Sequence, residues 1–257
     1  MKTFPVYVLS AGRWKTATTP RQLRVSGIPF TMVVEPEELE HYQRAFPYAS
    51  FVVLDQSKQG NAYARKKIQE HSESLEHEYH WQLDDNIAKF QIRRDGKNIA
   101  VSAIRVITGC EQFVRIHTNI AISGPAYSVW AFGYADEMSL NRQAASCMLI
   151  KNHTGNYFRG IACVDTDLHM QMLTQGYCTM RFNRLLIDKM ATGKLRGGCT
   201  DSDYVDKGRE QACRDLVEHW PGSFKINPKD PSRIAPSRIW DTFNQQPIMK
   251  KNLKESE

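Results

Sequence analysis

The sequence predicts an α/β fold in which a mostly parallel central sheet is flanked by helices within a single domain. In the first half of the chain, short β-rich runs alternate with helical stretches, which is the pattern of strands joined by helical crossovers. The 257 residues are 41% hydrophobic and 24% charged, with 15 Gly and 11 Pro. This ordinary globular composition argues against disordered, collagenous and repeat proteins, so we expect a soluble protein with a sizeable core.

The elements of the first half follow one another regularly. Four segments are rich in β-branched or aromatic residues and are expected to be strands: 5–9, 30–34, 50–54 and 79–83. Three helices are expected between them, at 20–26, 37–45 and 61–76. The first of these has Pro20 in its opening turn, and the last opens after Gly60.

The second half is less regular. Strands are expected at 90–94, 146–151 and 179–187, and helices at 98–117, 165–175 and 200–219. Asp165 is expected to cap its helix at the N-terminus. Residues 1–220 would then form the domain, and the proline-rich segment 221–257 would pack on it or trail from it.

Cysteine spacing and hydropathy restrict the class of protein. The closest two of the six cysteines, Cys199 and Cys213, are 14 positions apart, so no Cys-x-x-Cys pair is present to hold zinc or a redox disulfide. No apolar run approaches the roughly 18 residues that a bilayer crossing needs, and residues 1–10 lack a signal-peptide pattern. We expect a reduced, cytoplasmic protein that is not embedded in a membrane, with a monomer as the simplest assembly.

The charge balance bears on the partner. The chain has 34 Lys and Arg against 28 Asp and Glu, a net charge of +6, and its pI is about 9.0. A basic balance favours encounters with polyanions such as nucleic acid or nucleotide phosphates, but it carries no information about chemistry.

Asp84, Asp85 and Asn86 directly follow an expected buried strand. Open α/β sheets place ligands at the carboxyl ends of their strands. Adjacent carboxylate and amide oxygens there would suit Mg²⁺ or Mn²⁺, with substrate phosphates completing the coordination. The alternative is ordinary turn chemistry, since Asp and Asn are common turn residues.

Two helix starts are further candidates. Gly60 begins a helix that carries Arg65, and free N–H groups with fixed positive charge there would suit phosphates or a ribose. Asp165 and Asp167 lie at the start of a later helix, where one carboxylate can accept a proton from an attacking hydroxyl while the other orients the backbone. Each also has a plain structural explanation, as a solvated face or as a helix cap.

A basic, glycine-containing loop spans residues 194–198, with Arg196, Gly197 and Gly198 at its end. Such a loop can close over a diphosphate or meet a nucleic-acid backbone. An ordinary surface turn is the alternative.

Taken together, the strand-end Asp-Asp-Asn, the Gly60 helix and the Asp165 helix resemble, in this order over residues 6–187, the GT-A fold of nucleotide-sugar glycosyltransferases. Segments 8–14, 34–38 and 81–87 more narrowly resemble the TET-associated glycosyltransferases, a phage and bacterial family. The resemblance implies a GT-A-like, Rossmann-type sheet. It also implies transfer of a sugar from a nucleotide donor, by default a UDP-sugar, to 5-hydroxymethylcytosine (a 5-hydroxymethylpyrimidine) in DNA. The hydroxymethyl base would come from a partner TET-like dioxygenase, and the setting would be the cytoplasm of a phage-infected bacterium.

The resemblance also assigns residues. It places the nucleotide-sugar pocket at Ser10, Arg13, Glu35, Gly60 and Arg65, and we expect Asp84 and the loop residues Arg196, Gly197 and Gly198 to join it. It places a Mn²⁺ or Mg²⁺ site at Asp84, Asp85 and Asn86, although Asn86 stands at the third position of the motif, where the usual Asp-x-Asp has an Asp. Asp165 falls at the general base, with Asp167 nearby, and a base opposite the leaving diphosphate would invert the anomeric centre.

A DNA acceptor would need cations and aromatic surfaces around the site. The sequence offers these side chains without placing them on one face: Arg93, Arg94, Lys97, Lys194, Arg196, Trp130, Tyr134 and Trp220. Other readings stay open because the donor half of such a fold does not specify the acceptor. They are a glycosyltransferase acting on a protein, glycan or small molecule, a sugar-nucleotide nucleotidyltransferase, and a non-catalytic basic nucleic-acid-binding module.

Overall fold

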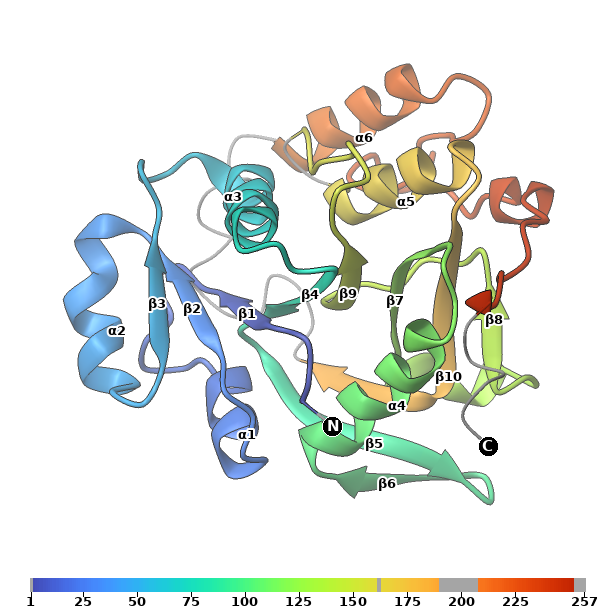
Figure 1. The fold of residues 1–257 in the computed structure, drawn as a ribbon. Coiled ribbons are helices and arrows are strands. Elements are labelled where there is room, and N and C mark those ends of the chain that lie inside the picture. The colour runs from blue at the N-terminus through green and yellow to red at the C-terminus, as the bar shows by residue number, and fades with distance from the viewer. Residues whose placement is uncertain (1, 161–162, 190–207, 252–257) are drawn as a thin grey trace.

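The computed structural model describes residues 2–160, 163–189 and 208–251. Its strands form one mixed sheet in the order β3-β2-β1-β4-β9-β7-β10-β5-β6, with β8 paired to β10 (Figure 1). The strands are β1 Val6–Leu9, β2 Thr31–Val34, β3 Ser50–Val53, β4 Tyr79–Asp84, β5 Ile87–Arg94, β6 Lys97–Val101, β7 Ile120–Tyr127, β8 Met138–Leu140, β9 Cys147–Lys151 and β10 Cys178–Lys189.

Helices cover both faces of the sheet (Figure 1). The α-helices are α1 Thr19–Val25, α2 Leu39–Ala45, α3 Gly60–Ser74, α4 Ala103–Arg115, α5 Val164–Thr174 and α6 Gly208–His219. Three 3₁₀ helices complete the described elements: η1 Pro36–Glu38, η2 Ser128–Gly133 and η5 Ile239–Thr242. No helix among the described residues is long and apolar enough to cross a membrane.

The two faces bury separate clusters because successive strand side chains point to opposite sides. In β1, Val6 and Val8 join the core under α1, α2 and α4, which includes Leu23 and Ile107. Tyr7 points the other way and packs with residues of α3. Strands buried on both faces in this way read as continuous apolar runs, which made β1 and β2 predictable, whereas β4 alternates apolar residues with buried His80 and Gln82.

The α/β class is confirmed, but the prediction of a mostly parallel sheet is wrong. Strands β1 to β4 pair in parallel where they meet, and β7 pairs in parallel with β10. Strand β9, however, runs antiparallel to both β4 and β7, while β5 and β8 run antiparallel to β10.

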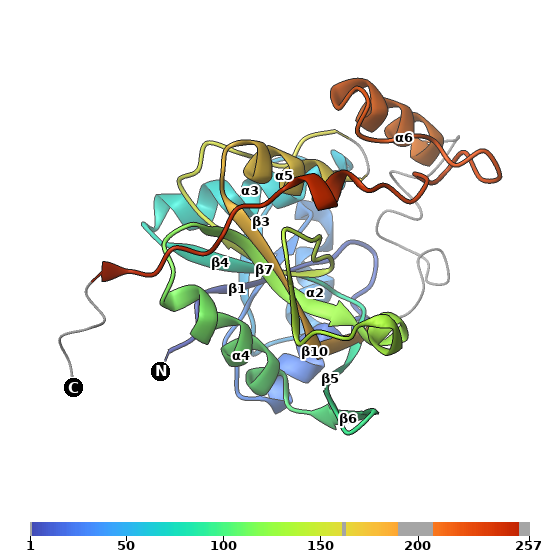
Figure 2. The same cartoon turned by 90° about the vertical axis from the view of Figure 1, so that its right-hand side faces the viewer.

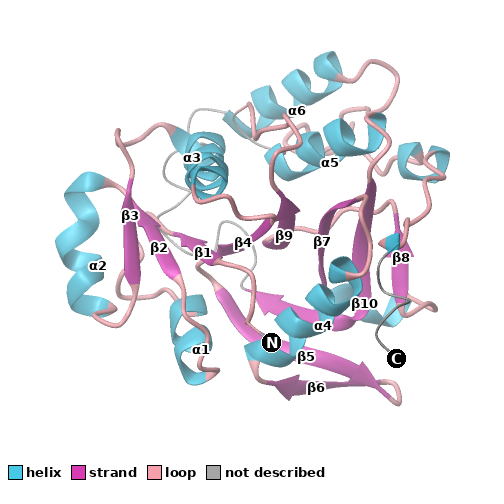
Figure 3. Cartoon of the chain, in the orientation of Figure 1, coloured by secondary structure: helices cyan, strands magenta, loops and turns pink. Residues whose placement is uncertain are grey.

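A further antiparallel pair is the tight hairpin between β5 and β6 (Figure 3). Asp95 and Gly96 form its turn with φ values of 50° and 73°. Two positive φ angles are what a two-residue hairpin turn requires, and Asp-Gly is a favoured pair for it. The predicted helix over 98–117 is therefore too long, because residues 97–101 are strand β6 and the helix begins at Ala103.

The segment after α6 packs across the molecule (Figure 2). Phe224 lies in a buried cluster with Met170 of α5 and Leu216 of α6. Further along, the Lys250 N–H donates to the carbonyl of Ile116 at 2.9 Å, just beyond the end of α4.

The strand directions bring several chain segments to one end of the sheet, at the carboxyl ends of its parallel strands, and this end is called the edge here. Strands β1, β2, β4, β7 and β10 all end at this edge, and antiparallel β9 begins there. The edge therefore gathers the last residues Asp84, Tyr127 and Lys189, together with Ser146, which precedes β9.

Candidate active site

Asp84 is held between two cations at this edge. Its Oδ1 accepts a hydrogen bond from Arg65 Nη2 at 2.5 Å, and its Oδ2 accepts one from Lys189 Nζ at 2.8 Å. Arg65 reaches it from the first half of α3, and Lys189 ends β10. The Asp84 side chain keeps 23% of its surface exposed and Lys189 keeps 16%, so a ligand can reach the pair from solvent.

The ionic state of this pair follows from its surroundings. Burial by itself would raise the pKa of the Asp84 carboxyl, but Lys189 and Arg65 more than offset it and hold that pKa well below its usual range. Burial would likewise lower the pKa of Lys189, and Asp84 instead raises it above the usual value. Asp84 is therefore a carboxylate and Lys189 an ammonium at physiological pH.

Ser146 and Tyr127 orient Lys189. Lys189 Nζ lies 2.6 Å from Ser146 Oγ, which shares a hydrogen bond of 2.7 Å with the Tyr127 hydroxyl. Ser146 has a φ of 63°, in the left-handed region that non-glycine residues seldom occupy, and its carbonyl accepts from the Asp84 N–H at 2.8 Å. Burial raises the pKa of Tyr127 to about 12, so its hydroxyl stays protonated. Two of the three N–H donors of the Lys189 ammonium are thus engaged, and these bonds fix the position of the lysine.

Asp85 faces a different partner set. Its Oδ1 pairs with Arg13 Nη1 at 2.9 Å, and its Oδ2 accepts from Ser10 Oγ at 2.6 Å. Ser10 in turn lies 2.6 Å from the hydroxyl of Tyr42 on α2. Burial raises the pKa of Asp85, against the opposing effect of Arg13. The predicted residues Ser10, Arg13 and Asp85 therefore form one buried cluster that fixes the loop after β1.

The three predicted metal ligands do not form a metal site within the described residues. Both oxygens of Asp84 accept from cations, and both oxygens of Asp85 are held by Arg13 and Ser10. Asn86 Oδ1 is buried and has no hydrogen-bond partner in the part of the chain that the structure describes. A single amide oxygen does not fit Mg²⁺ or Mn²⁺, which bind several oxygen ligands.

The described residues also contain no group of three or more His, Cys, Asp or Glu side chains that could hold a metal ion. The dependence on Mn²⁺ or Mg²⁺ stays a prediction, and no step below depends on it.

Asp165 lies in the first turn of α5, not at its cap as predicted. The cap is Cys163, whose φ of 55° turns the chain into the helix. Asp165 Oδ1 accepts from the N–H of Thr166 at 3.1 Å. Burial lowers the pKa of Lys189, and Asp84, Tyr127 and, as a smaller contribution, Asp165 raise it, so Asp165 lies close enough to act on the Asp84 cluster.

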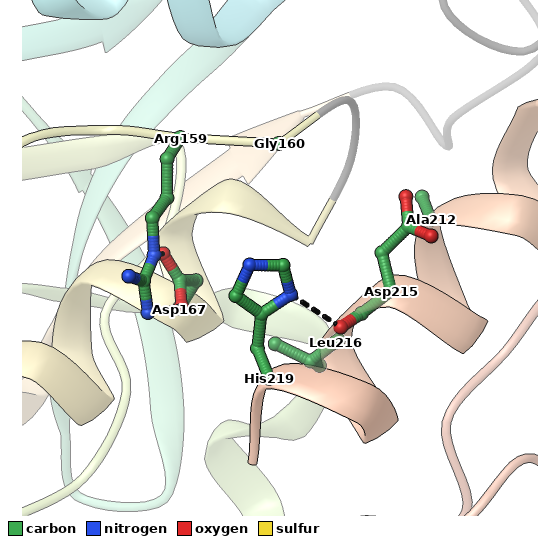
Figure 4. Close-up of a pocket in the computed structure, with 7 residues that line it drawn as sticks. All are labelled: Arg159, Gly160, Asp167, Ala212, Asp215, Leu216 and His219. Atoms are coloured by element: carbon green, nitrogen blue, oxygen red, sulfur yellow. Dashed lines mark hydrogen bonds and ion pairs between the residues drawn. The ribbon is translucent and has the colours of Figure 1, made fainter.

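Asp167, the second predicted catalytic carboxylate, is buried and fully engaged elsewhere. Its oxygens accept from Arg159 Nε at 2.7 Å, from Gln171 Nε2 at 2.7 Å and from Trp220 Nε1 at 2.8 Å. Figure 4 shows it beside Arg159, across a pocket from His219 on α6. These contacts tie α5 to Arg159, which precedes the helix, and to Trp220, which follows α6, and this is a structural role.

The remaining predicted residues lie along the same edge or fall outside the residues that the structure describes. Glu35 follows β2, and its Oε1 accepts from the Lys58 N–H at 2.8 Å. Gly60 is the first residue of α3, with a φ of 84°. Lys194, Arg196, Gly197 and Gly198 lie outside the described residues.

Lys189, Tyr127 and Ser146 are the site residues that sequence reasoning missed. Each stands at the end or start of a strand on the edge where Asp84 lies. The predicted strands 146–151 and 179–187 marked two of these positions to within a few residues. No sequence signal, however, showed that those strand ends meet Asp84.

Comparison with known proteins gives a family and a distant structural likeness. A model of the family described as TET-Associated Glycosyltransferase matches residues 4–198, which is more than half of the 257 residues. Among solved structures, the chain is similar to the crystal structure of S. aureus TarS, with 11% sequence identity and a TM-score of 0.47. That match covers 84% of this chain and 66% of the other, so this chain spans just under two thirds of its length. No curated protein matches the chain.

Proposed function

The chain belongs to the TET-associated glycosyltransferase family and is a glycosyltransferase, and we propose that it transfers a sugar from a nucleotide-sugar donor to 5-hydroxymethylcytosine in DNA. We take UDP as the donor nucleotide. The base would first be hydroxymethylated by a TET-like dioxygenase, in the cytoplasm of a phage-infected bacterium.

We place the donor at the edge that holds Asp84, as in a GT-A-like fold. The single observation that carries this placement is the Asp84–Lys189 pair, a charged group of each sign at the carboxyl ends of two strands. Parallel α/β sheets bind ligands at that edge. The donor's diphosphate would meet the ammonium of Lys189, and the loop with Ser10 and Arg13 lies along the same edge after β1.

The charge on Lys189 would then stabilise the leaving diphosphate. As the bond between the sugar and the diphosphate breaks, its electron pair leaves with the phosphate oxygen, and negative charge grows there. A fixed cation stabilises that charge more in the transition state than in the ground state. Because Lys189 is already oriented by Ser146 and Asp84, little reorganisation is required.

Asp165 would act as the general base. The hydroxymethyl oxygen attacks the anomeric carbon, its proton passes to the Asp165 carboxylate, and the diphosphate departs. Asp165 is partly exposed and accepts from the neighbouring Thr166 N–H, whereas the oxygens of Asp167 are already occupied by Arg159 and Trp220, which favours Asp165 for this role. With the base opposite the leaving group, the reaction inverts the anomeric centre.

The donor half is tested without DNA. The protein is incubated with a panel of UDP-, GDP- and ADP-sugars, with and without Mn²⁺, and release of nucleoside diphosphate is measured. Slow release from a UDP-sugar that falls in Lys189→Met supports the proposed donor site. Release from none of the donors, with a correctly folded protein, contradicts it and favours the non-catalytic alternative.

A further inference from the structure

The 3₁₀ helix η2 presents large apolar side chains to solvent immediately beside the Asp84 site. Val129, Trp130 and Phe132 are 69%, 59% and 72% exposed, while Ser128 and Ala131 face inward. Single exposed hydrophobic residues are common on protein surfaces, but three of them within four positions are not explained by packing.

A short path of contacts connects η2 to the site. The Trp130 ring packs edge-on against Tyr127, with centroids 5.2 Å apart and planes at 85°. The Tyr127 hydroxyl bonds to Ser146, and Ser146 bonds to Lys189. Trp130 is therefore separated from the Asp84–Lys189 pair by only two side chains.

Arginines accompany the aromatic rings. Arg93 of β5 lies over Phe132 with its Cζ 4.3 Å from the ring centroid, and Arg181 of β10 lies over Tyr134 at the same distance. Arg93 also donates to Asn98, whose amide donates to the carbonyl of Ser128, so the β5–β6 hairpin supports η2.

Two arginines give this surface positive charge. Arg93 and Arg181 have no carboxylate partner within the described residues. The nearby carboxylates of Asp95 and Glu137 pair instead with Arg94 and Arg184.

We propose that Trp130, Phe132, Tyr134, Arg93 and Arg181, called here the η2 platform, bind the unstacked acceptor strand of DNA. The inference rests on the proposed function and adds how the acceptor is held. A base inside a duplex cannot reach a buried reacting atom, so it must leave the stack or come from a single strand. Exposed aromatic rings stack such bases, and arginines meet their phosphates.

A single-stranded oligonucleotide that carries 5-hydroxymethylcytosine tests the platform by fluorescence anisotropy. We expect Trp130→Ala and Phe132→Ala each to weaken binding by about 10-fold, in the range of stacking losses for one base. Trp130→Phe should keep most of the affinity, because a ring remains. Arg93→Ala should reduce the dependence of affinity on salt concentration.

Tyr48→Ala is the matched control. Tyr48 is 39% exposed and lies under Arg24 at 4.9 Å, which copies the Arg–aromatic pairing, but it stands just before β3, at the opposite edge of the sheet. We expect its affinity for the oligonucleotide to equal that of the wild type. Melting temperatures of all variants establish that each is folded.

Unchanged affinity in folded Trp130→Ala and Phe132→Ala would overturn the platform, as would equal losses in Tyr48→Ala. Binding of an oligosaccharide or peptide at these residues in place of DNA would overturn it too. Failure of the platform is distinct from failure of the proposed function, because sugar transfer to 5-hydroxymethylcytosine by the wild type, measured by mass spectrometry, reports on the function whatever the affinities of the platform variants.

Discussion

Lys189 Nζ lies 2.8 Å from Asp84 Oδ2, which joins the last residue of β10 to the last residue of β4 across 105 positions of sequence. The sheet order places β9 and β7 between these two strands, so the contact spans the site and is not formed by neighbouring strands. The pair fixes a positive charge where a departing diphosphate would need one.

Replacing Lys189 by Met should slow sugar transfer strongly while keeping the volume of the side chain. Loss of one group that stabilises developing charge typically costs about 100-fold in kcat. The measurement is the steady-state rate of transfer at saturating donor, with circular dichroism to confirm folding. A kcat within about twofold of the wild-type value would show that Lys189 does not stabilise the transition state.

Asp165→Asn and Asp167→Asn should separate chemistry from structure. Asp165→Asn is expected to lower kcat by about 100-fold or more with little change in melting temperature, because it removes a base. Asp167→Asn is expected to lower the melting temperature instead, because Arg159 and Trp220 lose a charged acceptor. The opposite pattern in the two variants would reassign the base to Asp167.

Stability should fall as the pH is lowered from about 6.5 to 5. His169 is fully buried, with a hydrogen bond of 2.7 Å between Nδ1 and the Asp165 carbonyl, while its Nε2 accepts from the Ala144 N–H. Burial lowers the pKa of His169 to about 4 and that of buried His80 to about 3. In the unfolded chain these histidines have a pKa of 6.5, so below this pH they bind protons there while they stay neutral in the folded chain. The free energy of unfolding therefore decreases as the pH falls.

Urea unfolding at fixed ionic strength from pH 7 to pH 5 measures this effect. The depressed Asp84 pKa acts only at lower pH, since its stabilisation is lost below the ordinary carboxyl pKa of 3.8, and it does not contribute in this window. A constant free energy of unfolding between pH 7 and pH 5 would contradict the buried, neutral histidines.

Divalent-ion binding should strengthen when Lys189 is removed. Lys189 occupies one oxygen of Asp84, so Lys189→Ala frees a carboxylate oxygen two positions before Asn86, whose Oδ1 has no hydrogen-bond partner among the described residues. We expect tighter Mn²⁺ binding in this variant by isothermal titration calorimetry. Lys66→Ala, which removes an exposed lysine from α3, is the control. Weaker Mn²⁺ binding in Lys189→Ala would show that the lysine and the ion do not compete.

The sequence predicts the position of Asp84 well, because residues 79–83 alternate Tyr79, Trp81 and Leu83 with polar side chains and end at two adjacent aspartates. Of its two cationic partners, Arg65 was placed in the same predicted pocket, but Lys189 was not predictable. Whether Asp84 meets a metal or Lys189 depends on the pairing of β10 with β7 and β5, and long-range pairing is decided by tertiary contacts rather than by local pattern.

Strand β7 shows why part of the fold was missed. It contains Gly124 and Pro125, residues that are depleted in strands, so the segment does not look like one. Gly124 is required because a Cβ there would collide with the backbone carbonyl of Cys147 in β9. The close approach of two strands that made glycine necessary also concealed the strand whose last residue, Tyr127, borders the site.

The most direct test of the account is mass spectrometry of nucleosides from DNA that contains 5-hydroxymethylcytosine, after incubation with the protein and a panel of nucleotide sugars. Unmodified DNA and Asp165→Asn are the controls. We predict a mass gain of one sugar on 5-hydroxymethylcytosine that is absent from both controls. Release of nucleoside diphosphate without any mass gain on the DNA would contradict the proposed acceptor.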